Sequence, residues 1–189
     1  MSIIEDDSSA HLAARIARER ESRDWSLADL AARSGVSKAM LSKIERRQAS
    51  PTALIIGRIA AAFGLTLATL LTEPEAGEPR LLTKARQPVW GDPATGYVRR
   101  QVYLSAGMPV ELVEIELPPA AAVSFPASTY VLTRHVVWVL EGRLVIVEGD
   151  SRSELAAGDR LAFGPPSDTT FRNEARTPCR YLVTVLRTN

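Results

Sequence analysis

The chain has 189 residues, of which 46% are hydrophobic and 24% charged, and its formal net charge is +1. This composition excludes a mainly disordered or fibrous chain. No apolar run reaches the roughly 20 residues of a membrane span, and acidic residues stand where a signal peptide is basic. We therefore expect a cytoplasmic protein with no membrane partner. The single cysteine, Cys179, cannot form an internal disulfide, which fits that reducing compartment.

Residues 9–72 are predicted to form a bundle of five short amphipathic helices. Their apolar residues recur at helical spacing, Ser26 and Ser37 are N-cap candidates, and Gly35 and Gly64 interrupt the pattern. The same stretch holds ten lysines and arginines against five acidic residues, whereas residues 89–189 hold ten against eleven. A basic bundle in an almost neutral chain indicates a polyanionic partner.

Residues 73–88 are predicted to be a linker, because the stretch EPEAGEP at 73–79 is charged, contains proline and shows no periodicity. Residues 89–189 then form a second domain of short strands separated by glycine and proline. Such spacing is typical of an all-β sandwich or barrel. The predicted strands are 97–104, 110–117, 136–140, 143–147, 160–163, 169–172 and 181–186.

The segment from Trp25 to Thr52 contains the strongest motif. Two helices joined by a tight turn at residues 34–36 make a helix-turn-helix, whose second helix can enter the DNA major groove. Residues 9–72 resemble the XRE, or lambda-repressor-like, helix-turn-helix family. The resemblance rests on Leu30-Ala31, Gly35-Val36-Ser37, Leu41 to Glu45, Ser50-Pro51-Thr52 and the final FGLTLATLL.

This resemblance implies a set of DNA-binding residues on the second helix of the motif. Ser37 caps that helix and lets its N-terminus approach DNA. The positions that resemble base-contacting ones are Lys38, Ala39, Ser42 and Lys43, and we expect Arg46 and Arg47 to bind phosphates. The family often has glycine where this chain has Arg47. The resemblance also implies a structural ion pair between Arg20 and Glu45.

The segment from Leu112 to Asn189 resembles a cupin, a double-stranded β-helix barrel of the jelly-roll kind. The residues that carry this resemblance are Val139 to Gly142 for the first cupin motif, and Gly158-Asp159, Pro165-Pro166 and Asn173 for the second. The predicted fold is thus two-domain, an all-α helix-turn-helix bundle followed by an all-β barrel.

Metal-binding cupins present three histidines and a glutamate. At the corresponding positions this chain has Thr129, Val131, His135 and Thr169, so we expect no metal, no cofactor and no catalytic residue. We expect His135, Thr129, Thr169 and Phe171 to face inward as ligand-binding residues for a small organic molecule. His135 can equally be a structural histidine. Trp90, Arg99 and Arg100 serve either the outer face of the barrel or a dimer contact.

The sequence predicts a sequence-specific transcriptional regulator: a homodimer that binds two-fold symmetric double-stranded DNA and senses an unidentified small-molecule effector through a metal-free cupin domain. Two alternatives stay open. The cupin can be an enzyme, such as a metal-dependent dioxygenase or isomerase, with an accessory DNA-binding domain. It can also be only a dimer scaffold for the DNA-binding domain.

Overall fold

The structure is a computed structural model that describes residues 3–72 and 79–188. It divides into two compact units, with the boundary between residues 73 and 74, and each is described here by itself. Residues 73–78 of the predicted linker lie outside the described part. In the remainder of that stretch, a short 3-10 helix, η1, spans Lys84–Arg86. None of the described helices is long and apolar enough to span a membrane.

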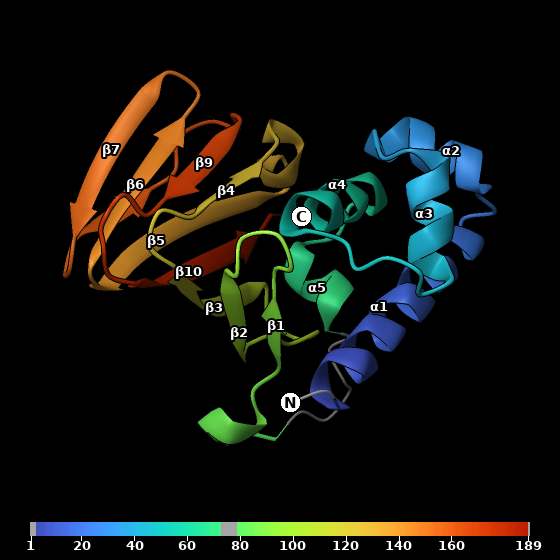
Figure 1. Cartoon of the computed structure of the whole chain (residues 1–189), viewed down its shortest axis with the longest axis horizontal. Helices are drawn as coiled ribbons and strands as arrows, with labels where there is room; N and C mark the ends of the chain where they lie inside the picture. The colour runs from blue at the N-terminus through green and yellow to red at the C-terminus, as the bar shows by residue number, and fades with distance from the viewer. Residues whose placement is uncertain (1–2, 73–78, 189) are drawn as a thin grey trace. The chain divides into compact units, whose positions relative to one another are not determined.

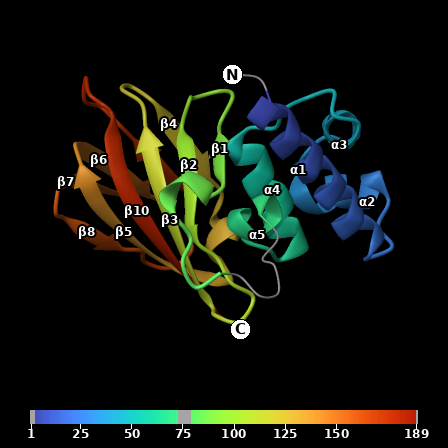
Figure 2. The ribbon, with the colours of Figure 1, turned by 90° about the horizontal axis from the view of Figure 1, so that it is seen from below.

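The first unit is a bundle of helices, seen in blue to green in Figures 1 and 2. The helices are α1 (Ile3–Glu21), α2 (Leu27–Ser34), α3 (Lys38–Glu45), α4 (Ala53–Phe63) and α5 (Leu67–Leu71). Apolar side chains from all of them are buried together, so the bundle has a core of its own. Its largest fully buried members are Ile16, Leu30, Leu41, Ile44, Ile56, Ile59 and Leu70.

Short-range hydrogen bonds define where these helices begin and end. The hydroxyls of Ser26 and Ser37 accept hydrogen bonds from the amides of Asp29 and Met40, at 3.2 Å in both cases. Gly35 and Gly64 follow α2 and α4 in the left-handed conformation, with φ of 66° and 70°. Glycine adopts this conformation without the steric cost that a Cβ brings. The predicted caps and helix stops are confirmed.

The second unit contains two antiparallel sheets, ordered β1-β2-β3-β10-β5-β8 and β4-β9-β6-β7. The strands of the larger sheet are β1 (Val89–Gly91), β2 (Val98–Tyr103), β3 (Val110–Leu117), β5 (Thr133–Glu141), β8 (Arg160–Ala162) and β10 (Cys179–Arg187). The smaller sheet contains β4 (Ala122–Phe125), β6 (Arg143–Glu148), β7 (Ser151–Ala156) and β9 (Thr169–Arg172), and a 3-10 helix, η2 (Ala127–Tyr130), precedes β5.

This strand order is that of a jelly roll, as the cupin resemblance implies. The sheets pack face to face, since the ring of Phe171 on β9 stacks on that of Tyr181 on β10 with 5.8 Å between centroids. Asn173 is buried and donates hydrogen bonds to the carbonyl oxygens of Leu117 and Thr177 at 2.9 and 2.8 Å. It thereby joins the end of β3 to the loop before β10. All seven predicted strands are present, and β1, β4 and β7 are additional.

Gly142, the last residue of the first cupin motif, stands where only glycine fits. Its φ is 80°, and a Cβ there would lie 2.9 Å from the carbonyl oxygen of Pro178. Gly142→Ala should therefore lower the free energy of unfolding of the jelly roll by about 2 kcal/mol or more. Thermal denaturation checks this, with Gly91→Ala as control because a Cβ at Gly91 has nothing within 4 Å. Equal stability of the two variants would contradict the prediction.

Candidate nucleic-acid interface and ligand site

The turn between α2 and α3 is held by local hydrogen bonds. The Gly35 amide donates to the carbonyl of Ala31 at 3.0 Å. The hydroxyl of Ser34 donates to the Leu30 carbonyl at 2.7 Å and accepts from the Val36 amide at 3.2 Å. Val36 is buried, so its side chain fills the angle between the two helices. These contacts fix the direction in which α3 leaves the turn.

The residues predicted to contact DNA bases gather on the outer side of α3. Leu41 and Ile44 are fully buried on the other side and anchor the helix to the core. The exposed Ser37 caps the N-terminus of α3. This end of the helix is open to a phosphate or a base edge. Lys38, Ala39 and Lys43 are exposed and Ser42 is half-buried.

The two arginines predicted to bind phosphates lie in the turn that ends α3, and both are exposed. The Arg47 amide donates to the Ile44 carbonyl at 2.9 Å and the Gln48 amide to the Lys43 carbonyl at 2.7 Å. This pair of bonds is a Schellman motif, which needs a left-handed residue, and Arg47 supplies it with φ of 60°. The turn is thus kept although an arginine stands where the family often has glycine.

Arg47→Gly should separate stability from DNA binding. Glycine relieves the left-handed strain, and after its greater unfolded-state entropy is counted, the helical unit should gain about 0.5 to 1 kcal/mol. DNA affinity should fall at the same time, because a phosphate-binding charge is lost. Arg47→Ala is the matched control, since it removes the charge and keeps the Cβ. Thermal denaturation and DNA titration of both variants check this, and a glycine variant less stable than the alanine variant would contradict it.

Other basic residues of the bundle serve its structure. Arg20 makes two hydrogen bonds to the Glu45 carboxylate, at 2.8 and 2.9 Å, and a third to the Trp25 carbonyl at 3.0 Å. The predicted pair of Arg20 and Glu45 is confirmed, and it ties α1 to the end of α3. The Arg33 guanidinium lies 4.2 Å from the centre of the Trp25 ring. Part of the positive charge counted in the sequence therefore stabilises the fold.

Three of the four predicted ligand-binding residues lie on strands and face the space between the sheets, and the fourth, Thr129, lies in η2. His135 shares the inner face of β5 with the buried Thr133 and Val137, and its Nε2 is hydrogen-bonded to the Thr133 hydroxyl at 2.9 Å. Thr169 and Phe171 are buried on β9. Thr129, in η2, has a buried hydroxyl oxygen with no hydrogen-bond partner among the described residues. These polar groups are surrounded by the rings of Tyr130, Phe163, Phe171 and Tyr181.

These residues do not fit the metal of metal-binding cupins. The hydroxyls of Thr129 and Thr169 replace two of the expected imidazoles, and His135 stacks on Phe163 with 5.6 Å between ring centroids. Residues 3–72 and 79–188 also contain no group of three or more histidine, cysteine, aspartate or glutamate side chains placed to hold a metal. The His135 imidazole packs against the ring of Phe163 and is hydrogen-bonded to the Thr133 hydroxyl.

Burial lowers the pKa of His135 from 6.5 to about 4, and the positive charge of Arg99 adds to this effect. Protonation then favours the unfolded chain, whose histidine is more basic. The free energy of unfolding of the jelly roll should therefore fall as the pH falls from about 6.5 to about 4, and His135→Gln should flatten this part of the curve. Denaturant titrations across this range check it, and an equally steep fall in His135→Gln would contradict it.

The sequence predicted Trp90, Arg99 and Arg100 on the outer face of the barrel or in a dimer contact, and the sheet register shows that this is wrong for two of them. Arg99 lies opposite Ile115 and Trp90, and Ile115 is buried in the interior. Arg99 and Trp90 therefore face inward. Arg100 has the opposite orientation and donates to the carbonyl of Lys84 at 3.1 Å. Successive strand residues point to opposite faces of a sheet, and only the register with strands distant in the chain shows which arginine faces inward.

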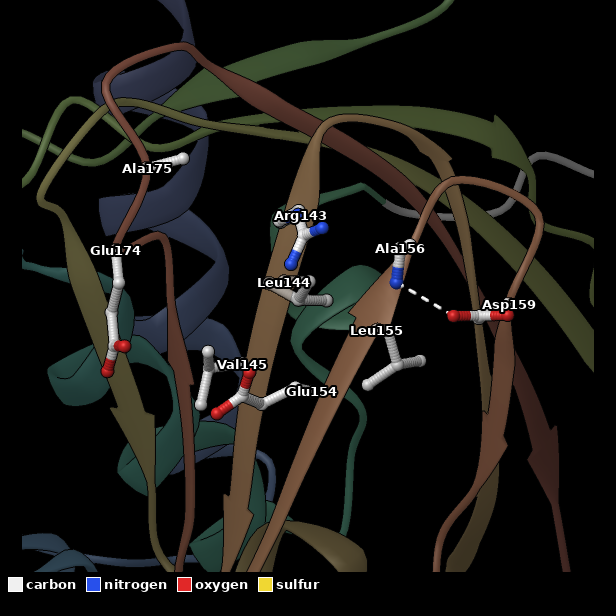
Figure 3. A pocket seen from close by; sticks show the side chains of 9 residues that line it. All are labelled: Arg143, Leu144, Val145, Glu154, Leu155, Ala156, Asp159, Glu174 and Ala175. Carbon is white, nitrogen blue, oxygen red and sulfur yellow. Dashed lines mark hydrogen bonds between the residues drawn. The ribbon is translucent and has the colours of Figure 1, made fainter.

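A separate pocket of 470 Å³ involves β6, β7 and the loop after β9 (Figure 3). Arg143, Glu154, Asp159 and Glu174 line it, and Asp159 accepts a hydrogen bond from the Ala156 amide at 2.8 Å. Arg152 bridges Glu154 and Glu174 at 3.1 and 3.0 Å. These two carboxylates are already paired with an arginine, so they offer little charge to a ligand.

Comparison with known proteins agrees with this arrangement. Residues 16–70 match the helix-turn-helix family HTH_3. The transcriptional regulator SutR of Escherichia coli is 28% identical over 160 residues, which are 82% of each chain. A helix-turn-helix regulator of Mycobacterium bovis is 45% identical over 74 residues, which cover 36% of this chain and 28% of that protein.

The crystal structure of an HTH_3 family regulator from Vibrio cholerae has the same fold throughout. Its TM-score is 0.79 with 22% identity, and the match covers 96% of this chain and 97% of that one. The helix-turn-helix geometry, the family match and the jelly-roll topology lead to one assignment. Residues 16–70 form a helix-turn-helix domain of the HTH_3 family, and the second unit has the jelly-roll fold that cupins share.

Proposed function

We propose that the protein binds a two-fold symmetric operator as a homodimer in the cytoplasm, that residues 9–72 read the DNA, and that residues 89–189 sense a small-molecule effector. The observation that carries the DNA-binding part is the outer side of α3, where exposed Lys38 and Lys43 stand opposite the buried Leu41 and Ile44. A helix anchored in this way presents lysines to guanine O6 and N7 in the major groove. Arg46 and Arg47 at its end then hold phosphates and set the register.

A single helix of eight residues supplies few contacts, which is the physical reason for a dimer. The outer face of the larger sheet supports self-association, because Trp138 and Leu186 are 48% and 42% exposed on the neighbouring strands β5 and β10. Leu182 lies directly opposite Trp138 and extends the apolar strip. Sedimentation of the intact chain tests this part, and a monomer at micromolar concentration would exclude it.

The effector-sensing part rests on the barrel interior. Residues that would hold a metal in other cupins are replaced, and the cluster of rings and hydroxyls around His135 suits an organic ligand. We infer from the replaced donors that the domain is no metal-dependent enzyme. Metal analysis of purified protein discriminates the two, since stoichiometric iron, manganese or zinc that is lost in His135→Gln would support the enzyme instead.

The decisive experiment is selection of bound DNA from a random pool by the purified full chain, with and without a metabolite extract. We expect an enriched sequence with two-fold symmetry, whose enrichment changes with the extract. Binding should weaken steeply as salt rises, because phosphate neutralisation releases counterions. Absence of any enriched sequence at moderate salt would refute the DNA-reading part. An enriched sequence that is indifferent to every metabolite would favour the scaffold alternative.

A further inference from the structure

Arg99 is a cation on the inner face of the jelly roll. It shares that face of β2 with Gln101. Arg99 lies opposite Ile115 on β3 and Gln101 lies opposite Val113. Gln101, Ile115 and Val113 are all buried. The Arg99 guanidinium donates to the Gln101 side-chain oxygen at 3.2 Å. The Gln101 amide nitrogen in turn donates to the carbonyls of Tyr103 and Leu112, at 2.7 and 3.2 Å. Gln101 is thereby fixed, and it orients the guanidinium.

The charge of this guanidinium reaches the predicted ligand-binding cluster. It lowers the pKa of His135 as the second cause after burial. It also partly offsets the rise that burial causes in the pKa values of Tyr97 and Tyr181. The register agrees with this position, because Ile115 lies opposite both Arg99 and Tyr181, and the ring of Tyr181 stacks on that of Phe171. Arg99 and His135 are both partly exposed, so solvent reaches each of them.

Among the side chains of residues 10–72 and 79–188, no carboxylate forms an ion pair with Arg99. The nearby acids have other partners: Glu111 lies 3.8 Å from Arg187, Asp92 accepts two hydrogen bonds from Thr95, and Glu148 accepts one from the Gly164 amide. His135 is neutral at physiological pH because burial disfavours its charged form. The inner cluster therefore has a positive charge without a carboxylate partner among the described residues. A ligand that covers Arg99 takes this charge out of water, where it is normally paired.

We propose that the interior of the jelly roll binds a small organic monocarboxylate, whose carboxylate pairs with Arg99 and whose apolar body packs against the rings of Tyr130 and Phe163. The guanidinium fork matches a carboxylate in geometry and charge. The hydroxyl of Thr129, buried and unpartnered among the described residues, is an additional hydrogen-bonding group for the same ligand. This inference deepens the effector-sensing part of the proposed function by naming the class of ligand.

The test is calorimetric titration of the intact chain with acetate, propionate and benzoate, and with benzamide as the uncharged counterpart of benzoate. We expect at least one carboxylate to bind with a Kd of about 1 mM or tighter, and benzamide to bind at least ~10-fold more weakly than benzoate. Arg99→Met should weaken carboxylate binding by about 10- to 100-fold, and Arg99→Lys by less. Arg100→Met is the matched control, because the neighbouring arginine faces outward, and it should bind as the unaltered chain does.

Two results would overturn the proposal. The first is that none of the three carboxylates binds to the intact chain, and the second is that they bind equally well to Arg99→Met and to the unaltered protein. If Arg99→Met fails to fold, the comparison of benzoate with benzamide on the unaltered chain still decides, since equal binding of the two refutes a role for charge. DNA affinity measured with and without benzoate is a separate readout. Arg99-dependent binding that leaves DNA affinity unchanged would refute effector sensing and leave the carboxylate site in place.

Discussion

Glu45→Gln should lower the free energy of unfolding of the helical unit by about 2 to 4 kcal/mol, because it removes the mostly buried carboxylate partner of Arg20 and leaves only the exposed one of Glu21. The side chains of Arg20 and Glu45 are only 14% and 13% exposed, and they meet through two hydrogen bonds. The pair joins α1 to the last residue of α3. Loss of the pair should therefore also loosen the helix that presents the DNA-binding residues. For a unit of this size the midpoint of thermal unfolding should fall by roughly 10 to 25 °C.

Glu21→Gln is the matched control for this prediction, since Glu21 contacts the same arginine at 3.1 Å but is 68% exposed. Screening by solvent limits such a pair to less than about 1 kcal/mol. Differential scanning calorimetry of the full chain can follow the helical transition, which DNA should shift to higher temperature. Similar losses in the two variants would show that burial does not distinguish the two contacts. The double variant Arg20→Met, Glu45→Leu should recover part of the loss, because no unpaired charge then remains.

Local signals explain why the helical unit could be predicted so closely. Ser26, Ser37, Gly35 and Gly64 each act within a few residues of their own position, so their roles follow from the sequence alone. The left-handed Arg47 is the exception, because its side chain has no preference for that conformation. The Schellman hydrogen bonds of the turn impose it, and these depend on where α3 stops.

The strands that escaped prediction have a common position. β1, β4 and β7 all lie at the edge of a sheet, where a strand has one neighbour and needs less apolar alternation. β7, with the sequence SRSELA, is mostly polar for this reason. Arg99, on the inner strand β2, escaped prediction for a different reason. An arginine reads as a surface residue in a short strand, and only its pairing with Ile115, distant in the chain, places it inside.

Lys43→Ala should have the largest effect on DNA recognition. Lys43 is exposed on α3, one residue before the buried Ile44, so its position is fixed by packing that the substitution does not touch. A base contact of this kind contributes about 1 to 3 kcal/mol. In a homodimer each substitution removes the contact from both half-sites, so the loss on the selected operator should reach about 2 to 6 kcal/mol, or roughly 30-fold to more than 10,000-fold in Kd. Binding to random DNA should weaken far less.

Arg47→Ala gives the contrasting result that makes the Lys43 prediction informative. A phosphate contact carries no sequence information, so this variant should lose affinity for operator and random DNA by the same factor. The slope of log affinity against log salt should also fall by about 1 for each subunit. The ratio of operator to random affinity, measured by fluorescence anisotropy at two salt concentrations, therefore falls in Lys43→Ala and stays constant in Arg47→Ala. If the ratio behaves alike in the two variants, the division of α3 and its following turn into base-reading and phosphate-binding residues is wrong, and the operator is recognised through residues outside this face.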